Sequence, residues 1–511
     1  MDNRSARPDR VRRRLLAALA GAGLGAALPN ARAASATSAW QSTFAPFDGP
    51  LGGSLGGGFD GSLECPALPV EGRLPDGLSG TLYRNGPARM RLGATRYHHW
   101  FDGDGMVQRF SLEAGRIAHR GVLLRTPKLI EEEAAGRFLY PSFGTAIAPA
   151  LPVLRPDTIN VANINVMTLA EGRELYALWE GGSALELDPK TLGAKGFKKW
   201  SPETAGAPFC AHPRIEPDGG VWAFGYVPGS GHLLVYQLSA LGALRRQAFI
   251  ELPQADMVHD FAVTEHYLVF LLMPLVYESQ ATYAGSFASH FRWDAKAPLV
   301  VAVLDKSDLS VRRFELPADG LFHIGNAWEE RGVIRLGYVS QPEILTVIQG
   351  RGLDAPYAAD PGATTRWKEI EVDLAAGRVR SVATGIERVE FPRFDTRLTG
   401  RTSPLTVLLE RSPAMPAAID GHDSVLAVRA GGCQRFRYGA NWIAEEHLFV
   451  PDRSSTHPEA GFLLGTAYDW QAERTALSIF DARHVDGGPV ARVLLPYGLP
   501  LGLHGQFVAK T

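Results

Sequence analysis

Hydrophobic positions from about residue 70 onward fall in short runs that Gly, Pro, Asp and Asn separate. β-Branched and aromatic residues dominate these runs, which is typical of strands bounded by turns. Polar, glycine-containing tips such as 216–220 and 113–115 lie between runs and suit tight hairpins. The pattern therefore predicts strands over residues 80–84, 106–112, 221–226, 233–238, 261–264 and 267–272.

Helical periodicity is convincing only over residues 129–137, where a short acidic segment is closed by Gly136. An all-β chain of this kind could be a sandwich, a barrel or a propeller. Length favours the propeller, because roughly 430 residues at about 40 to 65 per blade would make seven four-stranded blades. The sequence carries no WD or kelch signature, so we expect divergent blades with long insertions.

One such insertion spans residues 273–296 and is rich in aromatic side chains. A hydrophobic lid or substrate mouth, with peripheral membrane contact through residues 273–293, is one interpretation, and an ordinary packed loop is the other. No segment after the N-terminal region has 18 consecutive apolar residues, so we expect no membrane-spanning helix there.

The N-terminal residues are expected to be an export signal. Basic residues at 12–14 precede an apolar run over 15–28, and small residues follow at 31–33. Paired arginines before the run resemble a twin-arginine signal, and an ordinary Sec signal is the alternative. We therefore expect a signal over residues 1–33, a flexible linker or entry segment over 34–64, one propeller domain over 65–511, and export to the periplasm.

Charge and cysteine content narrow the choice of partner. The 52 Lys and Arg residues nearly balance the 54 Asp and Glu residues, for a formal net charge of -2, which argues against a nucleic-acid partner. Cys65, Cys210 and Cys433 are widely spaced and form no CxxC motif, which argues against a thiolate zinc site, although one pair could form a disulfide. The nearly neutral charge therefore favours a small or apolar molecule as the partner.

Four histidines, His212, His259, His323 and His504, lie among apolar residues at the expected start or end of a strand. In chain order they are 47, 64 and 181 residues apart, which corresponds to about one, one and three blades. Equivalent positions on different blades meet at the axis of a propeller, so these side chains could share one ion. A lone histidine is more often a satisfied polar residue, so the hypothesis depends on the whole set.

Nine motifs, in their order along the chain, resemble those of the carotenoid cleavage oxygenase family, which includes apocarotenoid- and stilbene-cleaving enzymes and retinoid isomerohydrolases. The most specific is His-Trp-Phe-Asp-Gly-Asp-Gly-Met at 99–106. The resemblance covers roughly residues 65 to 510. The other motifs lie at 80–87, 125–136, 163–166, 178–182, 211–213, 390–393, 446–451 and 504–505.

The resemblance implies a seven-bladed propeller with a dome of loops and short helices over an iron-bearing axis. Four neutral imidazoles suit Fe(II) and leave positions for dioxygen. Carboxylates that accept the second ring N–H would orient the rings and offset the charge of the metal. By this resemblance the catalytic iron ligands are His212, His259, His323 and His504, and the supporting carboxylates are Glu180, Glu390 and Glu446.

Some residues depart from the family pattern or have no ligand role in it. His447 stands where the family usually has proline, and the adjacent Glu445 leaves the identity of the carboxylate at 446 ambiguous. His99 is expected to be structural. The histidines without a matching ligand position are His98, His99, His119, His232, His266, His290, His422, His447, His457 and His484.

The activity that the resemblance implies is cleavage of a conjugated C=C bond by dioxygen, with two carbonyl products. A carotenoid or apocarotenoid substrate would need a long apolar tunnel. A stilbene would need a polar anchor for its phenol, for which Tyr97 and Lys128 are the candidate contacts. A non-catalytic binding module is the third alternative, and the intact ligand set argues against it. We expect an apolar polyene, in particular an apocarotenoid.

Overall fold

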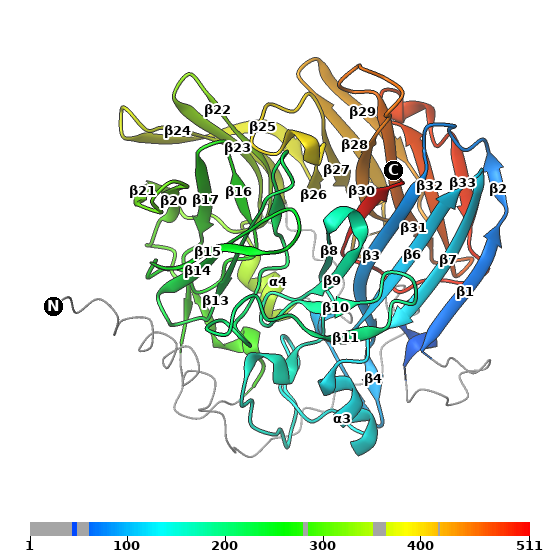
Figure 1. The fold of residues 1–511 in the computed structure, drawn as a ribbon, viewed down its shortest axis with the longest axis horizontal. Coiled ribbons are helices and arrows are strands. Elements are labelled where there is room, and N and C mark those ends of the chain that lie inside the picture. Colours follow the sequence, from blue (N-terminus) through cyan, green and yellow to red (C-terminus); the bar gives the residue numbers. More distant parts are fainter. Residues whose placement is uncertain (1–42, 49–60, 279–284, 351–363, 417–418, 511) are drawn as a thin grey trace.

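The structure is a computed structural model that describes residues 43–48, 61–278, 285–350, 364–416 and 419–510. Within these ranges, seven antiparallel sheets of four or five strands stand around a common axis (Figure 1). This arrangement is a seven-bladed β-propeller and confirms the predicted fold class. The predicted signal over residues 1–33 lies outside the described residues.

The blades are numbered here in chain order, and the strands of each are given from the axis outward. Blade 1 consists of β34 (His504–Ala509), β3 (Gly80–Arg89), β6 (Asp104–Glu113), β7 (Arg116–Leu123) and β1 (Ser62–Leu68). Blade 2 consists of β8 (Asn165–Leu169), β9 (Glu174–Leu178), β10 (Leu185–Leu187) and β11 (Ala194–Phe197). Blade 3 consists of β12 (Arg214–Ile215), β13 (Val221–Tyr226), β14 (His232–Leu238) and β15 (Leu244–Glu251).

The second half of the ring has the same layout. Blade 4 consists of β16 (Phe261–Val263), β17 (Tyr267–Leu272), β20 (Leu299–Asp305) and β21 (Val311–Leu316). Blade 5 consists of β22 (Leu321–Glu330), β23 (Val333–Ser340), β24 (Arg366–Asp373) and β25 (Arg378–Glu387). Blade 6 consists of β26 (Val389–Arg393), β27 (Thr406–Glu410), β28 (Ser424–Arg429) and β29 (Gly432–Arg437). Blade 7 consists of β30 (Trp442–Pro451), β31 (Gly461–Asp469), β32 (Arg474–Asp481), β33 (Ala491–Leu494) and β2 (Val70–Gly72).

Strands from the two ends of the chain close the ring. The C-terminal strand β34 is the inner strand of blade 1, where His504 lies opposite Asn85 of β3. The N-terminal strands β1 and β2 are neighbours in the chain, yet β1 pairs with β7 of blade 1 and β2 pairs with β33 of blade 7. Figure 1 shows the resulting seam, where blue strands lie beside orange and red ones. Closure therefore fixes His504 on the axis.

The predicted strands are confirmed, and the helix α4 (Ile344–Gly350) among the described residues was not predicted. The strands β13 and β17 have the predicted limits, and the other four predicted ranges overlap β3, β6, β14 and β16. The predicted helix is α3 (Pro127–Ala135), which the Thr126 side chain caps and Gly136 ends with φ 65°. A second helix, α4 (Ile344–Gly350), was not predicted, because its seven residues are too few to show a helical period.

Three inner strands carry β-bulges near the axis. On β22, residues 321 and 324 lie opposite residues 340 and 338 of β23, so three steps on one strand match two on the other. The same mismatch occurs on β26 between residues 390 and 393, and on β30 between 444 and 447. A bulge redirects side chains relative to the regular alternation of a strand. The bulges therefore lie at His323, Glu390 and Glu446, whose side chains they can direct toward the axis.

The predicted flexible linker or entry segment over residues 34–64 includes described residues that pack against the propeller. Phe44 is 0 % exposed and Phe47 is 3 % exposed, and the backbone N–H of Met90 donates to Asp48 at 2.8 Å. The strand β1 already begins at Ser62. Burial of Phe44 and Phe47 contributes about 2 kcal/mol each, which holds this part of the backbone in place.

The described part of the 273–296 insertion packs as an ordered unit. The short strands β18 (Leu275–Tyr277) and β19 (Phe291–Trp293) pair with each other, and Leu275 and Phe291 are buried. Among the described residues, the large hydrophobic side chains with the greatest exposure lie elsewhere, so membrane contact through this insertion stays a prediction. A search of the described helices for a stretch long and apolar enough to span a membrane finds none.

Candidate metal centre

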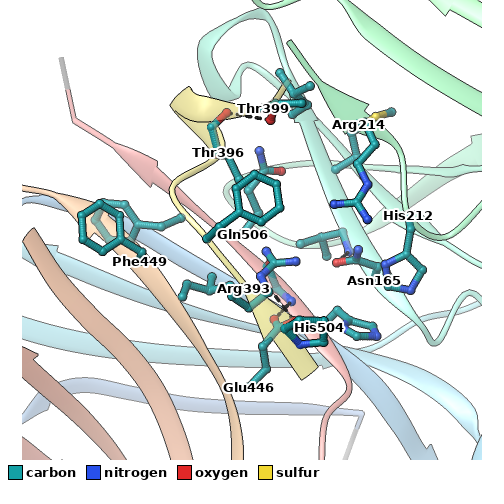
Figure 2. Close-up of a pocket in the computed structure, with 18 of the residues that line it drawn as sticks. Asn165, His212, Arg214, Arg393, Thr396, Thr399, Glu446, Phe449, His504 and Gln506 are labelled. Atoms are coloured by element: carbon teal, nitrogen blue, oxygen red, sulfur yellow. Dashed lines mark hydrogen bonds and ion pairs between the residues drawn. The ribbon is translucent and has the colours of Figure 1, made fainter. Parts of the chain in front are cut away.

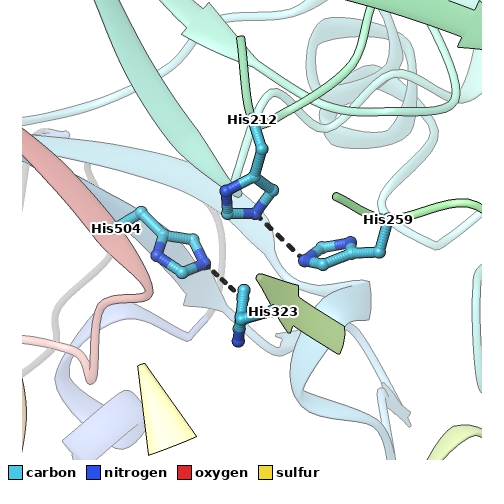
Figure 3. Close-up of side chains that lie close together, drawn as sticks. All are labelled: His212, His259, His323 and His504. Atoms are coloured by element: carbon cyan, nitrogen blue, oxygen red, sulfur yellow. Dashed lines mark hydrogen bonds between the residues drawn. The ribbon is translucent and has the colours of Figure 1, made fainter. Parts of the chain in front are cut away.

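Each blade contributes one residue of the candidate site: six come from the inner strand or the segment just before it, and Glu180 follows the second strand of blade 2. Going around the ring from blade 1, the contributions are His504, Glu180, His212, His259, His323, Glu390 and Glu446. The four imidazoles converge, with one ligand atom of each lying within 4.8 Å of the others (Figure 3). Nε2 of His212 lies 3.0 Å from Nε2 of His259, and Nε2 of His323 lies 3.1 Å from Nε2 of His504. The structure thus brings together the four histidines that the sequence singled out.

Three of these rings are held from behind by a carboxylate. Nδ1 of His259 lies 2.5 Å from Glu180, Nδ1 of His323 lies 2.6 Å from Glu390, and Nδ1 of His504 lies 2.8 Å from Glu446. Within the described part of the chain, the ring of His212 has no such carboxylate contact. All three carboxylates expected from the sequence therefore lie beside the histidines.

These contacts fix the tautomer of the rings. An ionised carboxylate only accepts hydrogen bonds, so Nδ1 of His323 and of His504 must carry the proton. In a neutral ring the lone pair is then on Nε2, and the two Nε2 atoms 3.1 Å apart would both present lone pairs to each other. Two acceptors repel each other unless a cation lies between them. The donor set therefore fits a shared metal ion rather than a hydrogen-bonded histidine cluster.

Burial and charge shape the protonation of the site. Burial, and then the three neighbouring rings, lower the pKa of His212 well below its ordinary value. Burial lowers the pKa of His504 to about 4, although Glu446 opposes this. Burial favours the neutral form of Glu446, but Arg393 and His504 outweigh it and lower the pKa of Glu446 to about 2. Neutral imidazoles backed by an anionic carboxylate are the form in which such a set binds a metal.

Other residues, which the sequence analysis did not identify, bind the three carboxylates by hydrogen bonds or an ion pair. The Tyr226 hydroxyl donates to Glu180 at 3.2 Å, and the backbone N–H of Phe391 donates to Glu390. Arg393 lies 3.5 Å from Glu446 as an ion pair. The only signal for Arg393 was its place in the 390–393 motif, and Tyr226 carried none beyond being part of a strand.

The structure separates the roles of the adjacent residues Glu445 and Glu446. Glu446 accepts from Nδ1 of His504 and from the backbone N–H of Gly505. Glu445 instead forms a buried ion pair with Arg84 at 3.1 Å and accepts from the hydroxyl of Thr466 at 2.6 Å. Both carboxylates sit at the bulge of β30, which explains how neighbours in one strand both find buried partners.

Histidines outside the set of four do not join the cluster within the described residues. Nδ1 of His447 lies 2.6 Å from the carbonyl of Glu445, and its Nε2 lies 2.9 Å from the Tyr438 hydroxyl. His99 accepts from the backbone N–H of Phe101 at 3.1 Å, and its Nε2 lies 3.2 Å from the carbonyl of Val347 in α4. Both therefore act as structural links.

Tyr97 and Lys128, the candidate substrate contacts, are joined but deeply buried. Nζ of Lys128 donates to the Tyr97 hydroxyl at 2.9 Å and to Glu132 at 2.6 Å, and it lies 3.6 Å from Asp104. Burial disfavours the charge, but Asp104, Tyr97 and Glu132 outweigh it and raise the pKa of Lys128 well above its ordinary value. The ring of Phe138 stacks on Tyr97 at 3.8 Å. The pair is thus one end of a charged cluster inside the protein.

Aromatic side chains and a cavity of mixed polarity surround the histidines. A chain of aromatic rings 5.4 to 6.0 Å apart runs from His259 through Phe322, Phe101 and Phe143 to Phe287 in the insertion. A cavity of about 340 Å³ beside His212, His323 and His504 is lined by arginines such as Arg214 and Arg393 and by apolar side chains such as Phe391 and Phe449 (Figure 2). Aromatic side chains therefore border the histidines both in this chain of rings and in the cavity.

The chain is similar in sequence to proteins of known activity. Residues 59–509 match the family described as RPE65, retinal pigment epithelial membrane protein. The chain is 31% identical to apocarotenoid-15,15'-oxygenase of Synechocystis, over 86% of this chain and 92% of that protein. It is 29% identical to lignostilbene-alpha,beta-dioxygenase isozyme III of Sphingomonas paucimobilis, over 86% and 93%.

A crystal structure shares the architecture. The cobalt-substituted Synechocystis apocarotenoid oxygenase superposes with a TM-score of 0.81 at 25% identity and covers 92% of this chain and 98% of that one. The match extends over nearly the whole described propeller and is accompanied by relatives named as carotenoid cleavage dioxygenases. The chain therefore belongs to the carotenoid cleavage oxygenase family.

Proposed function

We propose that this protein is an Fe(II)-dependent dioxygenase that cleaves a C=C double bond of an apolar, conjugated substrate into two carbonyl products. The observation that carries the proposal is the convergence of four imidazole Nε2 atoms whose rings are held, in three cases, by a carboxylate on Nδ1. This donor set fits a resident metal ion. A non-catalytic binding module would not require this set of metal-binding donors.

Iron is the metal that fits the chemistry of the donors best. Imidazole suits Fe(II), and a site without thiolates gives no preference for a thiophilic metal. His212, His259, His323 and His504 would hold the ion, and it would supply the activation of dioxygen. Glu180, Glu390 and Glu446 would keep the Nε2 lone pairs directed inward and offset the charge of the ion.

Aromatic side chains around the centre suit an apolar substrate. Phe322 lies 5.4 Å from the His259 ring, and Phe391 lies 5.3 Å from His323 and 5.4 Å from His504. These rings give a reacting polyene an apolar surface and limit access of water to it. An apocarotenoid is therefore our first choice of substrate, in line with the named activity of the Synechocystis relative.

A hydroxystilbene is the second choice, and the Tyr97 and Lys128 pair favours it. A phenol that reached this pair could replace the hydrogen bond of 2.9 Å between them. The relative from Sphingomonas paucimobilis is named for a lignostilbene substrate. Against this, Lys128 already satisfies Glu132 and Asp104, so a phenol would have to compete with two carboxylates.

The test is reconstitution with iron under anaerobic conditions, followed by exposure to air with an apocarotenal or a hydroxystilbene. Mass spectrometry of the products should show two carbonyl fragments from the apocarotenal. Aldehydes from the stilbene alone would replace the first choice by the second. Absence of product from any alkene despite bound iron would overturn the dioxygenase proposal and favour an isomerase or a binding protein.

We also propose export through the N-terminal segment and retain membrane contact as a prediction. The basic residues at 12–14 before the apolar run support the twin-arginine route. Replacing Arg12 and Arg13 by lysine in the full chain should retain the protein in the cytoplasm, whereas unchanged export would favour the Sec route. Sedimentation with lipid vesicles tests membrane contact, and recovery only in the supernatant would reject it.

A further inference from the structure

Arg393 lies beside one of the carboxylates that hold the histidines. Its Nε is 3.5 Å from Oε1 of Glu446, and its Nη2 donates to the carbonyl of Gly505 at 3.2 Å. Oε1 of Glu446 is also the atom that accepts from Nδ1 of His504, at 2.8 Å, and Oε2 accepts from the backbone N–H of Gly505 at 3.0 Å. Arg393 therefore touches both the carboxylate and the backbone that position His504.

The bulge on β26 explains why Arg393 can do this. Glu390 and Arg393 are three residues apart, and in a regular strand they would point to opposite faces. Their partners on β27, Leu409 and Val407, are only two apart, so β26 has one extra residue. Phe391 supplies the irregularity with a left-handed φ of 55°, which a non-glycine residue seldom adopts. Both Glu390 and Arg393 can then face the axis.

One five-residue strand thus controls two ligands of the proposed metal. Glu390 contacts His323 directly, at 2.6 Å. Arg393 acts on His504 through Glu446, and Figure 2 shows it lying beside both residues at the wall of the cavity. Because Nε2 of His323 and Nε2 of His504 are 3.1 Å apart, a small rotation of either ring changes how well the two can share one ion.

We propose that Arg393 is a positioning residue of the metal centre, which holds Glu446 against His504 and thereby fixes the direction of the His504 ring. The inference rests on the proposed metal site. It adds an arginine that acts on His504 through Glu446 and is supplied by the strand that also supplies Glu390.

The test is titration of the full-length, metal-depleted protein with Co(II), read by dissociation constant and by visible absorption spectrum. Arg393→Gln removes the charge, and we expect Co(II) to bind about 10-fold to 100-fold more weakly with a changed spectrum, as for other residues that support ligands. Arg393→Lys keeps the charge and loses the forked donor, so it should recover most of the affinity and remain about threefold weaker than the wild type.

Arg397→Gln is the matched control. Arg397 lines the same cavity, but its guanidinium pairs with Asp395 rather than with a residue of the site. Its affinity and spectrum should equal those of the wild type. Thermal unfolding, measured in parallel, shows whether each variant folds.

Unchanged affinity and spectrum in Arg393→Gln and Arg393→Lys would overturn the inference, as would an equal effect in Arg397→Gln. A lower melting temperature with an unchanged spectrum would mean that Arg393 is merely structural. If Arg393→Gln does not fold, Arg393→Lys carries the test by the same criterion. If the wild-type protein binds no metal, the proposed metal site itself is refuted. If the wild type binds metal and the Arg393 variants bind it equally well, only the role of Arg393 is refuted.

Discussion

Nδ1 of His259 lies 2.5 Å from Oε2 of Glu180, although the two residues are 79 positions apart in the chain. Glu180 follows the second strand of blade 2, and His259 precedes the first strand of blade 4. The contact therefore reaches past blade 3, which supplies His212. The carboxylate accepts a hydrogen bond from Nδ1–H of His259. In the neutral ring, the lone pair is therefore on Nε2, which faces the other three rings.

Replacing Glu180 by glutamine should weaken metal binding. The amide can still accept one hydrogen bond but carries no charge, so the ring is held less firmly and the charge of the ion is less offset. We expect a 10-fold to 100-fold loss of iron affinity, measured by competition with a chelator. Tyr226→Phe keeps the carboxylate and removes one hydrogen bond to it, so it should lose much less. Equal affinities for wild type and Glu180→Gln would contradict a supporting role for Glu180.

Replacing His259 by alanine should strongly reduce the iron content, because it removes one of four converging donors. The measurement is the ratio of iron to protein after reconstitution and desalting. His484→Ala is the control, since the side chain of His484 is 70 % exposed and lies far from the cluster in the outer loops of blade 7. A full iron content in His259→Ala would exclude His259 from the ligand set.

The sequence predicted the propeller because its strands are short, regularly spaced and bounded by strong turn residues. The four histidines were found because each sits near a strand end, their spacings correspond to about one, one and three blades, and the motifs around them resembled a known family. Glu446 was identified despite its neighbour Glu445, but only the structure separates their partners. A strand alternates its faces in sequence, and two adjacent carboxylates in a strand cannot be ordered by that rule where a bulge intervenes.

The residues that hold the carboxylates could not be predicted in this way. Tyr226 ends an ordinary hydrophobic strand, and its hydroxyl meets Glu180 only because blades 2 and 3 are adjacent. Arg393 faces the axis only because Phe391 adopts a left-handed conformation, which no residue type in the segment announces. Tertiary packing determines the contacts between blades and the register shifts. The spacing of strands and the turns between them can be read from the local sequence.

Tyr97→Phe distinguishes the two candidate substrates. The variant removes a hydroxyl that bonds to Lys128 at 2.9 Å and leaves every charge in place, so the fold should lose only about 1 kcal/mol. If a phenol binds this pair, KM for a hydroxystilbene should rise while KM for an apocarotenal stays unchanged. An unchanged KM for both substrates would remove Tyr97 from the substrate contacts.

Lys128→Met should act mainly on stability. It leaves the buried carboxylate of Glu132 without its ammonium partner at 2.6 Å, and breaking a buried pair from one side costs about 3–5 kcal/mol. Urea unfolding of this variant beside Tyr97→Phe measures the difference. Similar midpoints for the two variants would show that the charge of Lys128 is dispensable for the fold.

His119 should make the fold sensitive to acid, independently of the metal centre. Nε2 of His119 donates to Gln108 at 2.9 Å, and Nδ1 accepts from the Tyr497 hydroxyl at 2.8 Å, so the neutral ring is fully bonded. Burial, and then Arg109, lower the pKa of His119 to about 3. The unfolded chain binds a proton at this residue near pH 6.5, so folding excludes that proton at intermediate pH.

Because the pKa of His119 is lower in the folded state than in the unfolded state, the free energy of unfolding falls as the pH falls. The stabilisation is complete above about pH 6.5 and is lost as the pH falls toward 3, because the unfolded state binds more protons in that window. At pH 5 the loss from this residue is about 2 kcal/mol. His119→Gln cannot titrate, so its unfolding free energy should fall by about 2 kcal/mol less than that of the wild type between pH 7 and pH 5. Parallel pH dependence of the two proteins in urea unfolding would show that His119 is not the source of the acid sensitivity.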